Sequence, residues 1–266
     1  MKIDVEQKGI YDSTSFYSKL DALYSLHFMN LKKSIKAFFD LCRISNLPTV
    51  WTNVLAAVVL SDSPFSWSSY LILSASLSLF YSGGMSLNDL FDVEVDRVHK
   101  LFRPLPSGRA SIRDAILFTV VLFGLALFLL FFIPYREALY AGLFLLLVIF
   151  LYDQIHKRNP LTVFLIAMCR LMIFVVSGIA VSGTVGKAVV IAGVVQFVYV
   201  LVLSLMSRYE NSLKRKFPFP FIPLMLACIS LLDGIVMALL ASPAWLIACL
   251  GGTVLTHFGQ KYVRGD

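Results

Sequence analysis

The feature that most constrains this chain is a succession of apolar blocks, each close to the length that crosses a bilayer. A transmembrane helix needs about 20 consecutive, mostly apolar residues. Eight blocks approach that length, at about 47–61, 67–87, 114–133, 137–152, 161–183, 187–207, 217–240 and 242–259. Because 58% of the residues are hydrophobic and only 15% are charged, we predict an all-α, polytopic membrane helical bundle of about eight spans, the first and fourth of them short.

The residues before the first block are polar and mixed in charge, and they lack the apolar core of a cleavable signal. We therefore divide the chain into a cytoplasmic N-terminal extension, residues 1–36, and a membrane domain, residues 37–266. Apolar residues recur near helical spacing over residues 20–41, beside several lysines. This pattern predicts an amphipathic helix on the membrane surface.

Lysine and arginine are distributed unevenly between the loops that the blocks define. Seven precede the first block, five lie in 88–113, two in 153–160, four in 208–216 and two after residue 259. The opposite loops hold only Arg136 and Lys187. Cytoplasmic loops carry the excess of positive charge, so we predict an integral, multi-pass protein of the inner or cytoplasmic membrane with both termini cytoplasmic. This topology, with anionic membrane lipids as partners, accounts for the net charge of +7 without nucleic acid.

Charge is concentrated in one segment, SLNDLFDVEVDRVHKLFRPLPSGRAS, which covers residues 86–111. Asn88, Asp92 and Asp96 are four residues apart, so on a helix they project from one face, whereas we expect Asp89 to point toward a flank. Oxygen ligands in a row suit Mg²⁺, which is typically held by one or two carboxylates together with substrate phosphates. The pattern favours a metal–phosphate site, and the alternative is a salt-bridged loop at the membrane surface.

The same segment supplies cations that suit a diphosphate. Arginine matches phosphate oxygens with paired hydrogen bonds and stays charged at any physiological pH. The cations of the segment are Arg97, Lys100, Arg103 and Arg109.

Three stretches of the chain together resemble one known family. NDLFDVEVDR followed by RPLPSGRAS is similar to the first aspartate-rich motif, NDxxDxxxD, of the UbiA superfamily of intramembrane prenyltransferases. RISNLPTVWTNVLA resembles that family's first helix, and LYDQIHKRNPL resembles its loop with a tyrosine and a lysine after the fourth span. The similarity covers about residues 40–260.

This resemblance implies a fold, an activity and a set of site residues. The fold would be a helical bundle around a central cavity open to the cytoplasmic side. The activity would be transfer of an isoprenyl group from a prenyl diphosphate to a lipophilic or aromatic acceptor, with Mg²⁺ as cofactor. The resemblance implies that Asn88, Asp92 and Asp96 bind Mg²⁺ and that Asp92, Asp96, Tyr152 and Lys157 are catalytic. It places these residues at the substrates: Arg43, Asn46, Asn53, Arg103, Arg109, Asp153, Arg170, Arg208 and Lys214.

The chain departs from the family pattern after the sixth span. A second aspartate-rich motif, commonly DxxxD, is expected there, but this chain reads SLMSRYENSLKRKFP, in which Glu210 is the only acid and Lys214 lies four residues further on. Three interpretations follow: a second Mg²⁺ site with one carboxylate, a site in which cations replace the metal, or a loss of catalysis. The alternative function is therefore a non-catalytic membrane protein that binds or exports a lipid or metabolite precursor. The family also often has nine spans rather than eight.

Two charged residues lie inside predicted spans. A cation at membrane depth is costly unless it faces the interior of the bundle, so Arg170 is predicted either to bind diphosphate or to pair with an acid such as Asp153 or Asp233. Asp233 itself is predicted to make an interior hydrogen bond to a neighbouring helix. His156 lacks the spacing of a metal ligand, and we place it at an interface.

Overall fold

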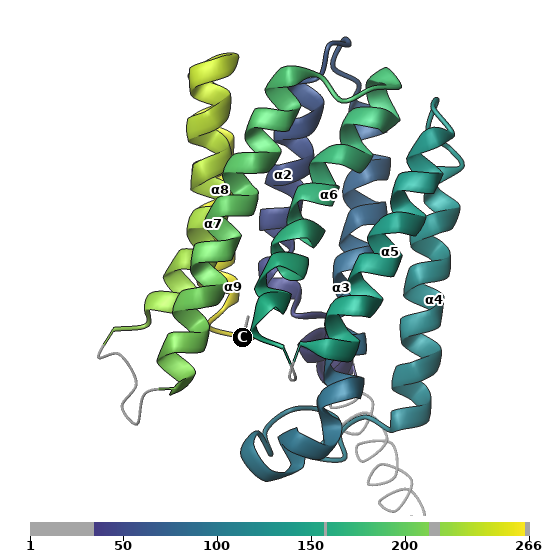
Figure 1. Ribbon diagram of the computed structural model, residues 1–266, viewed down its shortest axis with the longest axis vertical. Helices are drawn as coiled ribbons and strands as arrows, with labels where there is room; N and C mark the ends of the chain where they lie inside the picture. The colour runs from purple at the N-terminus through teal and green to yellow at the C-terminus, as the bar shows by residue number, and fades with distance from the viewer. Residues whose placement is uncertain (1–34, 157–158, 213–218, 264–266) are drawn as a thin grey trace, which may run out of the picture.

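The computed structural model of the protein describes residues 35–156, 159–212 and 219–263. All regular structure in these residues is helical. The elements follow in the order η1 (Ile44–Asn46), α2 (Leu47–Val59), α3 (Trp67–His99), α4 (Ile112–Leu130), α5 (Glu137–Ile155), η2 (Pro160–Thr162), α6 (Val163–Ser182), α7 (Lys187–Ser212), α8 (Phe221–Leu240) and α9 (Trp245–Gly259). The helices α2 to α9 run up and down in a single bundle (Figure 1).

The predicted apolar blocks correspond one by one to the helices α2 to α9. Within the described residues, α3 to α8 are each long and apolar enough to cross a membrane, whereas α2 and α9 are shorter apolar helices of 13 and 15 residues. The prediction that the fourth span is short is wrong, because α5 has 19 residues and continues to Ile155. The polar residues near the C-terminus of α5 end the apolar run in the sequence, but the helix continues through them.

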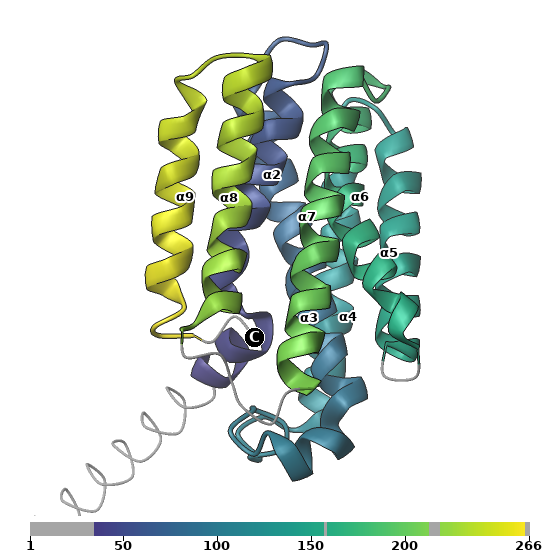
Figure 2. The same ribbon diagram turned by 60° about the vertical axis from the view of Figure 1, so that its left-hand side comes forward.

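Helix α2 occupies the centre of the bundle although it is short. It packs against α3, α6, α7, α8 and α9, and most of its residues are buried. Pro48 lies in its first turn, where a missing backbone N–H removes no helical hydrogen bond. Around α2, the consecutive helices α3 and α4, α6 and α7, and α8 and α9 form tightly packed pairs (Figure 2).

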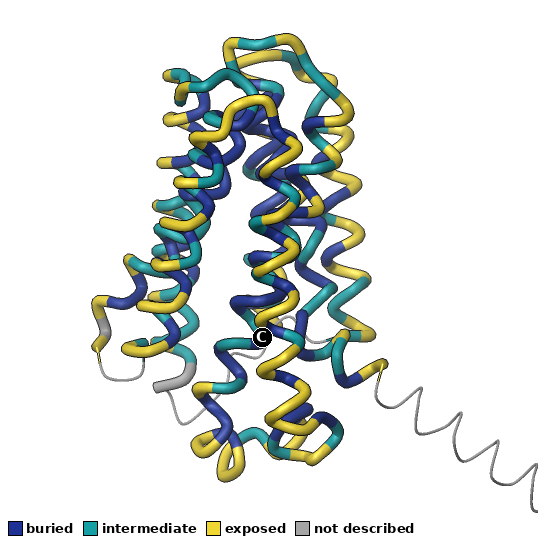
Figure 3. The backbone as a smooth tube through the Cα atoms, turned by 90° about the vertical axis from the view of Figure 1, so that its right-hand side faces the viewer, coloured by how far each residue is buried: buried dark blue, intermediate teal, exposed yellow. Residues whose placement is uncertain are grey.

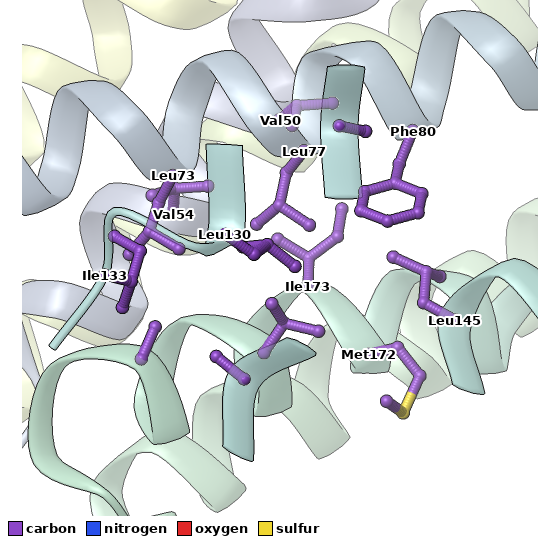
Figure 4. Packing of buried hydrophobic residues seen from close by; sticks show 14 of the residues in the cluster. Val50, Val54, Leu73, Leu77, Phe80, Leu130, Ile133, Leu145, Met172 and Ile173 are labelled. Carbon is purple, nitrogen blue, oxygen red and sulfur yellow. The ribbon is translucent and has the colours of Figure 1, made fainter. Parts of the chain in front are cut away.

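The largest hydrophobic core lies between α2, α3, α5 and α6 and the end of α4. Its labelled members in Figure 4 are Val50, Val54, Leu73, Leu77, Phe80, Leu130, Ile133, Leu145, Met172 and Ile173. The outward faces of the helices are exposed (Figure 3) and also carry large apolar side chains, such as Tyr140, Leu239 and Ile247. Apolar side chains on both the inner and the outer faces are what a bundle in lipid requires, so this is the fold of an integral membrane protein.

A smaller core holds together the end of the bundle where α3 terminates. The chain is helical over residues 35–42, and Ala37 and Leu41 of this segment are fully buried. They pack with Val93 of α3 and with Leu105 and Ala110 of the connection between α3 and α4. Most of the predicted amphipathic helix, up to residue 34, lies outside the described residues. The described residues 35–42 pack against the charged C-terminal end of α3.

The interior also contains a carboxylate that ties helices together. Asp233 of α8 is 1% exposed. It accepts hydrogen bonds of 2.7 Å from Asn53 Nδ2 of α2 and from Gln196 Nε2 of α7. The predicted interior hydrogen bond from Asp233 to a neighbouring helix is therefore confirmed.

Candidate functional site

The acidic motif occupies the last turns of α3, which stays helical to His99, beyond the apolar block. Asn88, Asp92 and Asp96 are all buried on this helix, as expected for side chains that share a face. The sequence predicts Asp89 on a neighbouring flank, but it joins the same cluster, since Arg103 contacts both Asp89 and Asp96. Asp89 is 3% exposed, because the segment before α2 and the connection after α3 cover this flank and supply arginines to it. Arg43 Nη2 lies 3.3 Å from Asp89 Oδ1.

Arg103 holds the acidic cluster together through a single nitrogen. Its Nη1 lies 3.0 Å from Asp89 Oδ1, 3.8 Å from Asp92 Oδ2 and 2.5 Å from Asp96 Oδ2. The connection that carries Arg103 is shaped by backbone hydrogen bonds from Arg103 N to Lys100 O and from Ser107 N to Arg103 O. Three carboxylates therefore surround one positively charged group. Without it, they would repel one another.

Arg43 reaches the cluster from an uncommon backbone conformation. Its φ is 46°, and no other non-glycine residue in the described part of the chain has a positive φ. A left-handed conformation is costly for a residue with a Cβ and tends to occur at functional sites. Here it joins the helical segment 35–42 to η1, and the side chain extends toward Asp89.

The oxygen set of this cluster suits a hard divalent cation that shares its coordination with phosphate. Its carboxylates already gather around a cation, Arg103 Nη1, and the buried Asp153 Oδ2 has no hydrogen-bond partner among the described residues. In the same residues no three His, Cys, Asp or Glu side chains are placed to hold one ion by themselves. That matches Mg²⁺ held by one or two carboxylates, with phosphate oxygens and waters completing its shell.

The end of α5 faces the acidic cluster and adds a histidine to it. Asn88 Nδ2 donates to Asp153 Oδ1 at 3.1 Å, and His156 Nε2 lies 3.2 Å from Asp92 Oδ1. The hydrogen bond with Asp92 raises the pKa of the imidazole above its ordinary value. The sequence reasoning placed His156 at an interface and missed this contact, because nothing in the spacing of the two residues along the chain signals it.

Arg208, near the end of α7, approaches the same place from another helix. Its Nη2 donates to His156 O at 3.1 Å and to Thr162 Oγ1 at 2.8 Å. The cation that precedes the degenerate second motif therefore lies beside the residue that contacts Asp92. Glu210 is half-buried on α7 and forms no ion pair with any residue that the structure describes.

A cavity of about 170 Å³ opens inside the bundle next to the cluster. Apolar residues such as Phe80, Ile149, Ile173 and Leu226 form most of its wall. The polar and charged residues that line it are Arg43, Asn46, Tyr81, Tyr152, Asp153, Arg170 and Ser204. The cavity therefore combines an apolar wall with charged groups, Arg43 and Asp153 beside the cluster and Arg170 on α6, and this lining suits a ligand with an anionic head and a hydrocarbon tail.

The structure separates some of the predicted site residues from this cavity. Arg109 lines a second pocket of about 260 Å³, together with Arg43, Asp89 and Arg103. Its Nη1 lies 2.6 Å from Asp40 Oδ2. Asn53 is fully buried and bonds to other side chains instead of lining the cavity. Lys157 and Lys214 lie outside the described residues.

An antiparallel bundle with apolar inner and outer faces defines an integral membrane protein, and its acid–arginine cluster beside an apolar cavity suits an anionic, lipophilic ligand. The match to a family model is more specific. The chain belongs to the UbiA prenyltransferase family, whose model matches residues 48–263.

Curated relatives with a named activity match part of the chain. Digeranylgeranylglyceryl phosphate synthase of Methanococcus vannielii is 33% identical over 153 residues, which are 56% of this chain and 54% of that protein. The protein of the same name from Sulfolobus acidocaldarius is 27% identical over 163 residues, or 59% of this chain and 57% of that protein. The chain thus spans about half the length of the curated relatives it matches.

Solved structures share the fold over most of the chain. A structure described for digeranylgeranylglyceryl phosphate synthase in membranes has a TM-score of 0.56 at 19% identity and covers 86% of this chain and 95% of that one. A UbiA homolog from Archaeoglobus fulgidus bound to GPP and Mg²⁺ has a TM-score of 0.53 at 16% identity and covers 85% and 97%. These likenesses confirm the predicted helical membrane bundle.

Proposed function

We propose that this protein transfers an isoprenyl group from a prenyl diphosphate to a lipophilic or aromatic acceptor within the membrane, with Mg²⁺ as cofactor. The observation that carries the proposal is the cluster of Asp89, Asp92 and Asp96 with Arg43 and Arg103 beside an apolar cavity, to which Arg43 connects it, since Arg43 contacts Asp89 and also lines the cavity. Carboxylates suit the metal and arginines suit the diphosphate oxygens. The apolar wall suits the isoprenyl tail.

The comparisons support this donor and suggest a class of acceptor. The homolog from Archaeoglobus fulgidus has been described with GPP and with DMAPP, each together with Mg²⁺. Matching curated relatives are named digeranylgeranylglyceryl phosphate synthases. We therefore regard a prenylated glyceryl phosphate as the first acceptor to test, beside the quinone and phenolic acceptors that the sequence leaves open.

The proposed chemistry assigns a task to each part of the site. Bound Mg²⁺ would neutralise negative charge on the diphosphate. The bond between C1 of the prenyl group and oxygen breaks, its electron pair leaves with the diphosphate, and Arg43 and Arg103 stabilise the departing anion. The allylic cation forms in a cavity whose wall is mostly apolar and excludes water, with Tyr81 and Tyr152 among its lining residues. The acceptor then bonds to C1 and loses a proton.

For the degenerate second motif, we favour replacement of the second metal by cations. Arg208 reaches the loop after α5 and lies beside His156, which in turn contacts Asp92. A guanidinium at this position would supply positive charge near the diphosphate, as a second Mg²⁺ would in a family member with both motifs. Asp92, Asp96, Tyr152 and Lys157 keep the catalytic roles that the resemblance implies.

The test is turnover by the purified full chain in lipid nanodiscs. Radiolabelled geranylgeranyl diphosphate is supplied with geranylgeranylglyceryl phosphate, a quinone precursor or a phenolic acid, each with Mg²⁺ or with EDTA. A prenylated product that forms only with Mg²⁺ supports the proposal. Mg²⁺-dependent binding of the donor without any product favours the non-catalytic alternative, and the absence of such binding contradicts the proposed function.

A further inference from the structure

Arg170 is a half-buried cation inside the bundle that the proposed chemistry does not use. It lies on α6, within a candidate membrane span, and it lines the cavity. Its Nη1 donates to Asn53 Oδ1 at 2.8 Å and to Thr49 Oγ1 at 3.3 Å. Direct pairing with Asp153 or Asp233, one of the two predicted alternatives, is not found, since no carboxylate of the described residues forms an ion pair with Arg170.

A chain of hydrogen bonds on the side of α2 and α8 fixes the position of Arg170. Asp233 accepts from Gln196 and from Asn53, so both of its oxygens are engaged. Because the amide nitrogen of Asn53 donates to Asp233, its oxygen is turned toward Arg170. Asp233 thus fixes the orientation of Asn53, whose amide oxygen gives the guanidinium a hydrogen-bond acceptor inside the bundle.

The other side of the guanidinium faces the cavity. Both hydrogen bonds to Asn53 and Thr49 come from Nη1, whereas a guanidinium has five N–H groups spread over three nitrogens. Cζ of Arg170 lies 6.0 Å from the centre of the Tyr81 ring, and Tyr81 OH accepts from Asn46 Nδ2 at 3.1 Å. Tyr81 and Asn46 line the cavity with Arg170.

This group lies deeper in the bundle than the acidic cluster. Tyr81 precedes Asn88 by seven residues on the same helix, which corresponds to a rise of about 10 Å. The diphosphate already has Arg43 and Arg103 beside the carboxylates. Arg170 lies about two helical turns further into the bundle than the acidic cluster. It is therefore positioned to contact another part of the two substrates than the diphosphate.

We propose that Arg170, with Tyr81 and Asn46, binds an anionic group of the acceptor and selects acceptors that carry a phosphate or a carboxylate. The inference rests on the proposed function and names the class of its second substrate. An anionic acceptor gives the guanidinium a counter-charge in a medium where that interaction is strong. A neutral analogue supplies no counter-charge to the desolvated guanidinium. A site rejects an analogue that leaves one of its polar groups without such a partner.

The experiment uses two matched pairs of probes whose members differ in one charged group. The pairs are geranylgeranylglyceryl phosphate with geranylgeranylglycerol, and 4-hydroxybenzoate with 4-hydroxybenzyl alcohol. Binding of each probe to the full chain is measured by calorimetry without prenyl diphosphate, for the wild type, Arg170→Gln and Arg170→Lys. Arg136→Gln, which changes an exposed arginine outside the cavity, is the control.

We expect the wild type and Arg136→Gln to bind the anionic member of at least one pair about tenfold or more tightly than the neutral member. Arg170→Gln loses this preference, Arg170→Lys keeps part of it, and geranylgeranyl diphosphate with Mg²⁺ binds all four proteins alike. Equal binding of the two members of both pairs by the wild type, or binding of no member, overturns the inference without relying on a variant.

A further outcome separates this site from the donor site. If Arg170→Gln weakens geranylgeranyl diphosphate as much as the anionic acceptor, Arg170 belongs to the diphosphate site and the inference is wrong. If instead the wild type prefers the anionic acceptor but does not bind geranylgeranyl diphosphate with Mg²⁺, the proposed function fails and the anion site stands.

Discussion

Arg103 places one nitrogen among three carboxylate groups, and this contact explains how so much charge is buried at the end of α3. Asp89 and Asp96 are almost inaccessible, and buried carboxylates without a counter-charge would be protonated or would destabilise the fold. Two of the three carboxylates, Asp92 and Asp96, are predicted ligands of Mg²⁺. Arg103 and a metal ion therefore compete for one set of oxygens.

This competition leads to a prediction for Arg103→Gln. Without the guanidinium between the carboxylates, we expect Mn²⁺ alone to bind about tenfold more tightly, since the metal no longer displaces a cation. Affinity for geranylgeranyl diphosphate with Mg²⁺ should fall by a similar factor, because charge-assisted hydrogen bonds to the diphosphate are lost. Electron paramagnetic resonance measures bound Mn²⁺, and Arg97→Gln, at an exposed pair with Glu94, is the control. A weaker metal affinity in Arg103→Gln would contradict the competition.

The carboxylates themselves can be tested with changes that keep their size. We expect Asp92→Asn and Asp96→Asn each to reduce the Mg²⁺-dependent affinity for geranylgeranyl diphosphate more than tenfold, because an amide is a weaker ligand for a hard cation than a carboxylate. Glu94→Gln, at an exposed position of the same helix, should leave this affinity unchanged. Scintillation proximity binding with labelled diphosphate gives the values, and unchanged affinity in either aspartate variant refutes its assignment as a ligand.

At the scale of elements, the end of α7 decides between the interpretations of the second motif. If cations replace the second metal, Arg208→Gln lowers turnover by about tenfold or more, because positive charge near the leaving diphosphate is lost, and Glu210→Gln has little effect. If Glu210 holds a metal, the order of the two effects is reversed. Thr162→Val removes one hydrogen-bond acceptor of Arg208, while the charge of Arg208 stays in place. A loss as large in Thr162→Val as in Arg208→Gln would show that Arg208 acts by shaping the loop.

The pairing of α8 with α9 depends on close approach at one glycine. A Cβ on Gly234 would lie 2.7 Å from Cys249 Cβ and 3.3 Å from the backbone at Leu246, so Gly234→Ala forces the helices apart. We expect a loss of about 1–3 kcal/mol in the free energy of unfolding. In Gly251→Ala, on α9, the added methyl meets no atom within 4 Å, so this variant should be as stable as the wild type. Unfolding in mixed micelles compares them, and equal stability of the two variants would contradict the packing.

At the scale of the whole molecule, the structure brings the two ends of the described chain to the same end of the bundle. Gln260 Nε2, just after α9, donates to Asn46 Oδ1, just before α2, at 3.3 Å. With the helices α2 to α9 between them, the chain crosses the bundle an even number of times. The positive loops lie at this end, and we propose that it faces the cytoplasm.

Cysteine labelling tests this topology. Lys36→Cys and Lys261→Cys should react with a membrane-impermeant maleimide only in inside-out vesicles, and Arg136→Cys and Lys187→Cys only in right-side-out vesicles. The wild type is the control for reaction at the native cysteines, because all four are free thiols and Cys169 and Cys228 are only half-buried. Labelling of Lys261→Cys from the opposite side to Lys36→Cys would mean an odd number of spans.

The sequence alone determined the features that depend on short-range spacing. The apolar blocks predicted the helices α2 to α9, since a spanning helix needs an apolar run of known length. The helical period placed Asn88, Asp92 and Asp96 on one face, and the cost of a lone charge in lipid predicted the hydrogen bonds of Asp233. The family of the chain was also readable from the motif around these residues.

Contacts between residues of different elements depend on the packing of the helices and could not be predicted from the sequence. Asp89 joins the site because Arg43 and Arg103 arrive from segments on either side of α3, and His156 joins it because α5 ends opposite Asp92. Arg170 is held by Asn53 of α2 rather than by an acid, and Arg109 pairs with Asp40 instead of lining the cavity. Helical periodicity determines which residues share a face, but the partner of that face depends on how whole helices pack, and packing is set by the summed contacts of side chains far apart in the chain.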